Sequence, residues 1–250
     1  RSFLGVAIGA ILFAPAGGQE RISHRVSETS AKIDELLKSK WSGARITPAA
    51  ASDDAEFLRR ASLDLTGCIP SEEEARAFLD DPSPRKRQAR VDDLLATDAF
   101  AELWGRIVAE SLVGDYDGLA INPGKYLEGD ARRKAVKKFL AYLKEHISRD
   151  TPWPRIVSEL LEASGKGSET PPLFFKLSYW SGQGEAPLGF ADGMSKSLLG
   201  IRISCAQCHD HPFDRWTQDD YYGLAAFFSR TRARPLDVDG DDCKDVEIVE

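Results

Sequence analysis

Sulfur and imidazole side chains are scarce in this sequence. Its 250 residues include only four cysteines, four histidines and one methionine, Met194. Yet two of the cysteines and two of the histidines fall together within residues 205–211. A chain of this composition would show the pattern C-x-x-C-H by chance only about once in a thousand sequences. The cluster therefore predicts a chemical function.

Positive charge is the minority charge. The 33 Lys and Arg residues are outnumbered by 40 Asp and Glu residues, which leaves a net charge of −7. This balance argues against a general nucleic-acid-binding surface, and we expect no nucleic acid among the partners. Basic runs at 84–90 and 132–138 are interpreted as solvated helix faces, and docking of an acidic redox partner is the alternative interpretation.

The apolar run at 3–14, behind Arg1, falls short of the roughly 18 to 20 residues that span a membrane. Because Ala14-Pro15-Ala16 follows it, residues 1–16 are typical of a secretory signal peptide, here clipped at its N-terminus. We therefore expect an exported protein, periplasmic or secreted. A buried core helix and an uncleaved anchor are the alternatives, and only the anchor would make the membrane a partner. Export would also allow Cys68 and Cys243 to form a disulfide.

Cys205, Cys208 and His209 form the signature of c-type haem attachment. In this chemistry two thiols add to the vinyl groups of the porphyrin, and the adjacent histidine ligates the iron. Residues three apart lie on one face of a helical turn, so both thiols can reach the same porphyrin. We therefore expect one covalent haem c, with His209 as an axial iron ligand.

Other interpretations of the cluster remain open. A zinc site built from Cys205, Cys208, His209 and His211 would place two adjacent residues on one tetrahedron, which is unusual spacing for zinc ligands. A thioredoxin-like pair of cysteines would need a βαβ context that the sequence does not show. An ordinary disulfide between Cys205 and Cys208 is the third alternative.

The second axial ligand would decide what such a haem can do, because a filled position favours electron transfer and an open one admits small ligands. The candidates are Met194, His146 and His24, and an open or exogenously filled position is the alternative. His211 lies too close to His209 in the chain to reach the opposite face of the same porphyrin.

Residues that follow the signature are expected to form the surroundings of the haem. His211, Arg215 and Trp216 are candidates for hydrogen bonds to the haem propionates, and Asp210 is a candidate for orienting the imidazole of His209. No other catalytic constellation stands out in the sequence.

The spacing of apolar residues predicts an all-α fold with irregular or orthogonal helix packing around a single haem and little or no strand. Asp53 or Ser52, Ser71 and Thr217 are predicted N-caps, and Gly67 is a predicted helix stop. Residues 173–180 form the one segment that could be a short strand, and residues 114–129 and 165–172 are predicted loops. We expect a linker at 17–30, a helical domain at 31–232 and, at 233–250, a linker toward a further domain. Predicted helices occupy 29–41, 52–67, 72–81, 83–96, 98–113, 132–150, 155–164, 185–200 and 218–230.

Three stretches, 58–79, 145–165 and 205–228, are together similar to the planctomycete cytochrome-c-type domain, also called domain of unknown function 1549. The resemblance implies a covalent haem in the N-terminal part of a larger secreted protein, with no known reaction. By position it implies that Cys205 and Cys208 are the attachment cysteines, that His209 is the proximal ligand, and that Asp210, His211 and Asp214 complete the signature. The sequence departs from the family at Cys68, where an apolar residue or proline is expected, and at 105–112, which lacks a histidine found in many relatives.

The leading functional hypothesis is outer-sphere electron transfer with an unidentified redox partner protein. One alternative is an enzyme or sensor with a five-coordinate haem. Another is a binding module, part of a larger saccharide-processing protein, in which the haem or a metal is only a structural staple.

Overall fold

The computed structural model describes residues 17–114, 127, 129–180, 186–237 and 244–249, with side chains from residue 28 onward except at 186, 187, 235, 237 and 244. The chain divides into two compact units, Arg1–Ser52 and Asp53–Glu250. Within the described residues no helix combines the length and apolar character needed to cross a membrane. The predicted signal peptide and Cys243 lie outside the described residues.

The first unit contains helix α1, Gly17–Gly43. The predicted helix at 29–41 is therefore present, but the structure begins it at Gly17, where the sequence analysis predicted a linker over 17–30. The segment contains no proline, and its polar residues are compatible with a helix, so polarity alone was a poor argument for a linker.

The second unit starts with three short helices, α2 (Asp54–Thr66), α3 (Glu72–Asp80) and α4 (Lys86–Leu95), which pack on one another through α2. The predicted ends at Asp53, Gly67 and Ser71 are confirmed, whereas the helix predicted at 83–96 begins at Lys86. Asp53 accepts a hydrogen bond from the Glu56 amide, and Gly67 closes α2 in the left-handed conformation. Ser71 forms a capping box at the start of α3.

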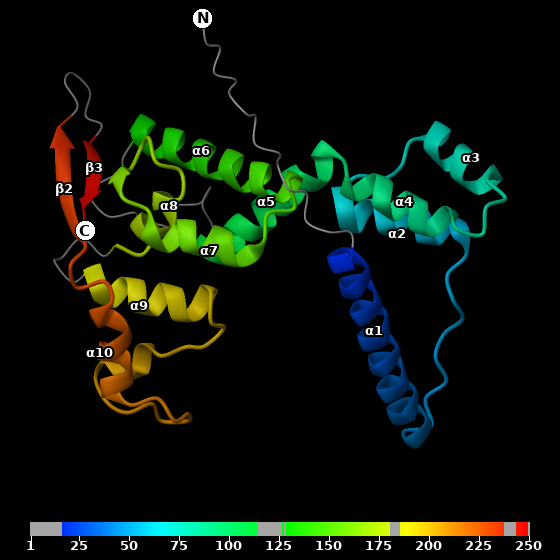
Figure 1. The fold of residues 1–250 in the computed structure, drawn as a ribbon, viewed down its shortest axis with the longest axis horizontal. Coiled ribbons are helices and arrows are strands. Elements are labelled where there is room, and N and C mark those ends of the chain that lie inside the picture. The colour runs from blue at the N-terminus through cyan, green and yellow to red at the C-terminus, as the bar shows by residue number, and fades with distance from the viewer. Residues whose placement is uncertain (1–16, 115–126, 128, 181–185, 238–243, 250) are drawn as a thin grey trace, which may run out of the picture. The chain divides into compact units, whose positions relative to one another are not determined.

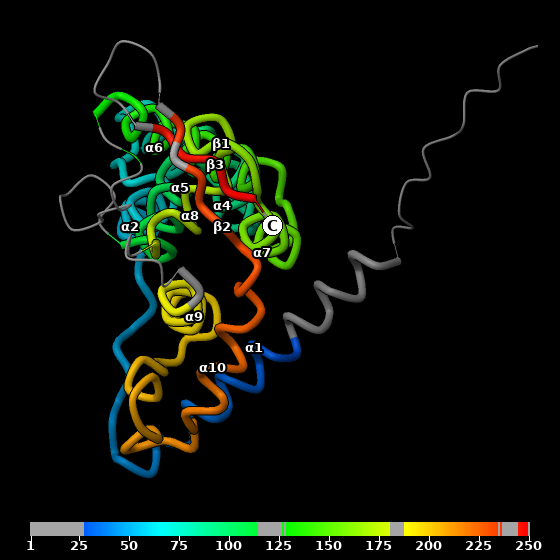
Figure 2. Tube along the Cα trace, turned by 90° about the vertical axis from the view of Figure 1, so that its left-hand side faces the viewer, coloured from blue at the N-terminus to red at the C-terminus, as the bar shows by residue number. Residues whose placement is uncertain are grey.

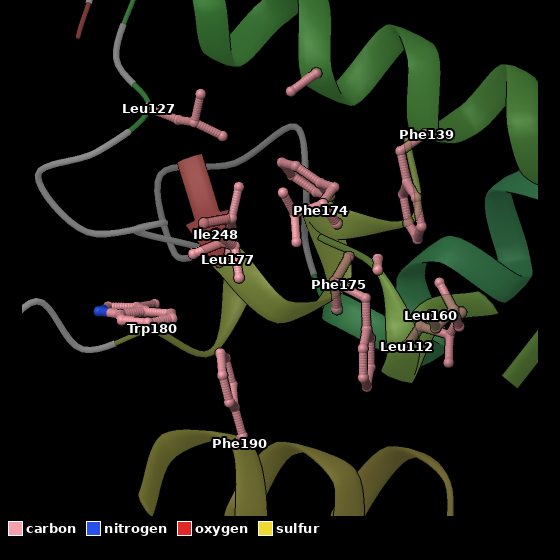
Figure 3. Packing of buried hydrophobic residues seen from close by; sticks show 14 of the residues in the cluster. Leu112, Leu127, Phe139, Leu160, Phe174, Phe175, Leu177, Trp180, Phe190 and Ile248 are labelled. Carbon is pink, nitrogen blue, oxygen red and sulfur yellow. The ribbon is translucent and has the colours of Figure 1, made fainter. Parts of the chain in front are cut away.

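The main core lies between α5 (Asp98–Val113), α6 (Gly129–Ser148), α7 (Trp153–Glu162) and α8 (Leu173–Ser178), which lie beside one another in Figure 1. Thr97 caps α5, its side chain accepting a hydrogen bond from the Phe100 amide. Phe139 and Phe174 pack in this core with ring centroids 5.3 Å apart (Figure 3). The prediction of a mostly helical domain is confirmed.

Helix α8 corrects a prediction, because residues 173–180 were the candidate strand. The helix begins directly after Pro171 and Pro172, and its side chains Leu173, Phe174 and Phe175 are all buried. A short, continuous apolar run fits a buried strand and a buried helix equally well, so its periodicity could not separate them.

A small antiparallel sheet covers part of this core. It consists of β1 (Gly165–Lys166), β2 (Arg232–Asp237) and β3 (Lys244–Val249), in the order β1-β3-β2. Figure 3 shows Ile248 of β3 beside Leu177 of the core. The predicted linker at 233–250 is therefore wrong for the strand residues, because Val246 and Ile248 are fully buried. The predicted loop at 165–172 likewise begins as a strand.

The last part of the unit consists of α9 (Ala186–Ser197), the 3₁₀ helix η2 (Ser204–Gln207) and α10 (Gln218–Ala226). Both α9 and η2 contact α10, and Figure 2 shows α9 beside α10. A second, smaller cluster of buried residues joins these three elements: Ala191, Ile203, Ala206, Tyr221 and Ala225. This cluster supports the C-x-x-C-H turn.

Candidate haem-attachment site

Both cysteines of the signature lie on one short, exposed turn. Cys205 and Cys208 are free thiols and are exposed, and the Cys208 amide donates a hydrogen bond to the Cys205 carbonyl. Cys208 follows the 3₁₀ helix directly as its C-cap residue, so one short segment carries both thiols, three residues apart. Between them Ala206 is fully buried against the small cluster. The turn is thus anchored by its inward side chain while the thiols face outward.

The imidazole of His209 is exposed and has a defined hydrogen bond. Its Nδ1 atom lies 2.7 Å from the backbone carbonyl oxygen of Asp210. A carbonyl oxygen can only accept, so Nδ1 carries the proton in the neutral ring and Nε2 keeps its lone pair. This is the tautomer that a metal-ligating histidine needs. The donor set, two free thiols and one imidazole with an available nitrogen, therefore fits a covalently attached haem.

The carboxylate of Asp210 has a different role from the predicted one. It accepts a hydrogen bond from the Gln218 amide at 2.9 Å, while the carbonyl of the same residue contacts the His209 ring. The Gln218 side chain and the Tyr222 hydroxyl both donate to the Gln207 carbonyl, at 3.1 and 3.2 Å. Helix α10 therefore holds the signature turn through three polar contacts that the sequence did not reveal.

The helix that holds the turn is itself firmly capped. Thr217 forms the predicted N-cap, and Asp220 completes a capping box. Hydrogen bonds from the backbone and hydroxyl of Thr217 lower the pKa of Asp220 below its ordinary value. The carboxylate thus stays charged at the helix N-terminus, where negative charge is favourable.

Trp216 and Arg215 form a pair at the end of the loop. The Arg215 guanidinium lies over the Trp216 ring, 4.9 Å from the centroid, and the indole N–H donates to Asp214 at 3.1 Å. Trp216 also packs against the small cluster. The guanidinium is therefore held close to the signature by a partly buried ring, which suits contact with an anionic group.

His211 and Phe213 occupy the middle of the loop. The Phe213 amide donates to Nδ1 of His211, and the His211 amide donates to the Trp216 carbonyl at 2.8 Å, which closes the loop. The Phe213 ring is 95% exposed. Its centroid lies 6.5 Å from that of His211, so the loop that follows the two cysteines presents an exposed apolar ring, a feature that the sequence analysis missed.

The candidate second ligands have other partners. Met194 packs against the main core, not against the cluster that supports the signature. His146 is largely buried, and its Nε2 lies 3.1 Å from Glu159. Among the described contacts neither residue touches the C-x-x-C-H turn. The side chain of His24 lies outside the described residues.

A zinc site receives no geometric support in the described part of the chain. No group of three or more Cys, His, Asp or Glu side chains there is placed to hold one metal ion. Cys205, Cys208, His209 and His211 therefore form no such group in the described structure.

The fold and site define a mostly helical domain that presents an exposed C-x-x-C-H turn. The family model described as a protein of unknown function (DUF1549), PSCyt2, matches residues 32–233. Because the match covers most of the chain, the protein belongs to this family. No curated protein and no solved structure is significantly similar to the chain.

Proposed function

We propose that this protein is an exported c-type cytochrome domain of planctomycete type that carries one covalent haem and transfers electrons. The observation that carries the proposal is the exposed turn on which the free thiols of Cys205 and Cys208 lie three residues apart, next to a His209 ring whose Nδ1 contacts the Asp210 carbonyl. Its thiols would form the two thioether bonds, and His209 would be an axial ligand. When bound, the haem would supply one-electron redox chemistry.

The residues around the turn have distinct tasks in this proposal. The Asp210 carbonyl keeps the proton on Nδ1 of His209 and fixes the direction of the ring. Arg215, held over Trp216, supplies a positive charge for the propionates. Phe213 and Tyr222 offer apolar surface that excludes water from one side of the ring system. His211 keeps the loop closed and is not used as a ligand.

A haem with an open second position is the other candidate function. It is favoured by one observation: Met194 and His146 are both engaged elsewhere in the described structure. A five-coordinate haem would bind small exogenous ligands, which suits a sensor or an enzyme.

A redox partner protein would dock by surface charge. The two basic runs differ in whether their charges are already used in ion pairs within the protein. In 84–90, Lys86 and Arg87 both pair with Asp54, and Arg90 pairs with Glu74. This run is therefore committed to holding α4 against α2 and α3. The run at 132–138 lies on α6, and among the described contacts Lys134, Lys137 and Lys138 form no ion pair, so it is the better candidate for an acidic partner.

The test is expression of the chain in a host with export and cytochrome c maturation, followed by a haem stain on a denaturing gel and a pyridine haemochrome spectrum. We expect a c-type band that survives denaturation and is lost in Cys205→Ala/Cys208→Ala. Cys68→Ala is the matched control, since Cys68 is also exposed and free, and it should retain the band. Absence of covalent haem in the wild-type chain would overturn the proposal. Carbon monoxide binding by the reduced protein then separates an open second position from a filled one.

A further inference from the structure

A cavity of about 240 Å³ lies where side chains from three helices meet. None of its lining residues belongs to the C-x-x-C-H turn. Helix α5 contributes Phe100, Trp104 and Val108, spaced four residues apart on one face. From α6 come Leu143 and Ile147, and from α7 Trp153 and Ile156. The turn between α6 and α7 completes the wall with Asp150 and Thr151. Figure 1 shows these three helices beside one another.

Two polar groups in this wall lack partners. The Nε1–H of Trp104 is buried and has no hydrogen-bond acceptor in the described structure. Asp150 is the single charged residue among the nine described residues that line the cavity, and no described side chain pairs with its carboxylate. The exposed Asp150 carboxylate is open to a cation, whereas the buried Trp104 Nε1–H has almost no surface that a ligand could reach.

The turn that carries Asp150 has a constrained backbone. Asp150 has a φ of 48°, and the Asp150 and Thr151 amides close the end of α6 on the Ile147 and His146 carbonyls. Trp153 then stands between two prolines at the start of α7, and its ring is 45% exposed. The carboxylate and the indole ring are therefore presented on a rigid connection.

The composition of the wall selects the class of ligand. Seven of the nine lining residues are apolar or aromatic, so a sugar, which needs many hydrogen-bond partners, would be poorly served. An aromatic body suits the cavity, since about 150 Å³ already holds a benzene molecule in a protein core. An ammonium group on a short chain suits Asp150 and the indole faces.

We propose that this cavity binds a small arylalkylamine, with its ring among Phe100, Trp104 and the aliphatic residues and its ammonium group at Asp150. The site is separate from the proposed haem function, because none of its lining residues belongs to the C-x-x-C-H turn or its supporting cluster. The protein would then respond to an organic cation as well as to a redox partner.

The experiment is calorimetric titration of the purified full chain, in the haem state in which it is isolated, with 2-phenylethylamine. Two isosteric probes remove the charge or reverse it: 2-phenylethanol and 3-phenylpropionate. We expect saturable binding of the amine, about fivefold weaker binding of the alcohol and the weakest binding for the acid. No saturable binding of the amine, or equal binding of all three, would overturn the proposal.

Variants locate the charge that is recognised. In Asp150→Asn we expect the amine to lose about fivefold in affinity and to bind no better than the alcohol. Asparagine adopts positive φ as readily as aspartate, so the turn is preserved. Glu73→Gln removes an equal charge from an exposed site on α3 and should leave all three affinities unchanged. Unchanged amine binding in Asp150→Asn contradicts the assignment.

A second readout places the ring of the ligand. The indole N–H resonance of Trp104, assigned with Trp104→Phe, should shift during titration with the amine. That of Trp216 should stay constant, because its N–H is already bonded to Asp214. A shift of the Trp216 resonance alone, or no shift of either indole resonance, would show that the amine binds outside this cavity.

Discussion

The ring of Tyr179 lies directly against the backbone of Gly193. A Cβ atom at Gly193 would come within 2.3 Å of Cγ in that ring, and one at Gly189 within 2.0 Å of the Tyr179 carbonyl oxygen. The hydroxyl of Tyr179 also donates to the Leu112 carbonyl in α5. One tyrosine thus connects α9 with the main core, and two glycines on one face of α9 make room for it.

Gly193→Ala should therefore destabilise the protein by about 2 kcal/mol, the range found for overpacked cores. The free energy of unfolding from urea titration measures this. Gly223→Ala is the matched control, because Gly223 is in α10 and a Cβ there meets nothing within 4 Å. It should stabilise α10 slightly, since alanine is the better helix former. Equal effects of the two substitutions would contradict the role of Tyr179.

Asp245 gives a second prediction about stability. Its buried carboxylate accepts from the Ser168 hydroxyl at 2.5 Å and from the Ser168 and Val246 amides. Asp245→Ala should lower the free energy of unfolding by about 3 kcal/mol, because buried donors lose a charged acceptor. Asp245→Asn should recover much of this loss. Asp93→Asn, at an exposed site on α4, should have no measurable effect.

The lowered pKa of Glu74 predicts how the stability of the protein depends on pH. Its pKa is lowered to about 2, first by the hydrogen bond from Arg90 and then by those from the Ser71 amide and hydroxyl. Because the folded-state pKa lies below the unfolded value, the contribution is complete above about pH 4.5 and is lost as the pH falls toward about 2.

Replacement of Glu74 by Gln should therefore flatten the dependence of stability on pH in this window. At neutral pH it should cost about 1 kcal/mol, because the carboxylate is partly exposed and the pair is screened. Urea midpoints measured across the acid range check this. Glu73→Gln, which removes a neighbouring carboxylate without these contacts, should keep the wild-type slope.

Substitution of Asp210 distinguishes two roles that its carboxylate could have in the candidate site. If its carboxylate serves only the Gln218 amide, Asp210→Ala should lower stability by about 1 kcal/mol and leave the spectrum of the proposed haem unchanged. If it orients the His209 ring, the spectrum and the reduction potential should shift. We expect the first result, because the contact to the ring comes from the backbone carbonyl.

Features that depend on neighbours in the sequence could be predicted. Asp53, Ser71 and Thr217 cap their helices through residues only three positions away, so the pattern was visible in the chain. The C-x-x-C-H turn was visible for the same reason. Its haem chemistry, the export of the protein and its redox partner stay predictions.

Features that depend on distant residues could not be predicted. The burial of Val246 and Ile248 requires a partner strand at Gly165 and Lys166, far away in the chain. The sequence analysis therefore predicted a linker at 233–250. The aromatic cavity likewise arises only when three helices meet. The role of the Asp210 carbonyl involves backbone geometry, which side-chain identity does not encode.

The pairing of β1 with β3 joins the two ends of a segment that contains α8, α9, the C-x-x-C-H turn and α10. Synthesis runs from the N-terminus, so the turn leaves the ribosome before β3 exists. Until then the two ends of this segment are not paired. The segment becomes a closed loop only when Val246 and Ile248 are buried in the core. Any enzyme that modified the two thiols would therefore meet an unclosed segment before β3 pairs with β1 and a closed loop afterwards.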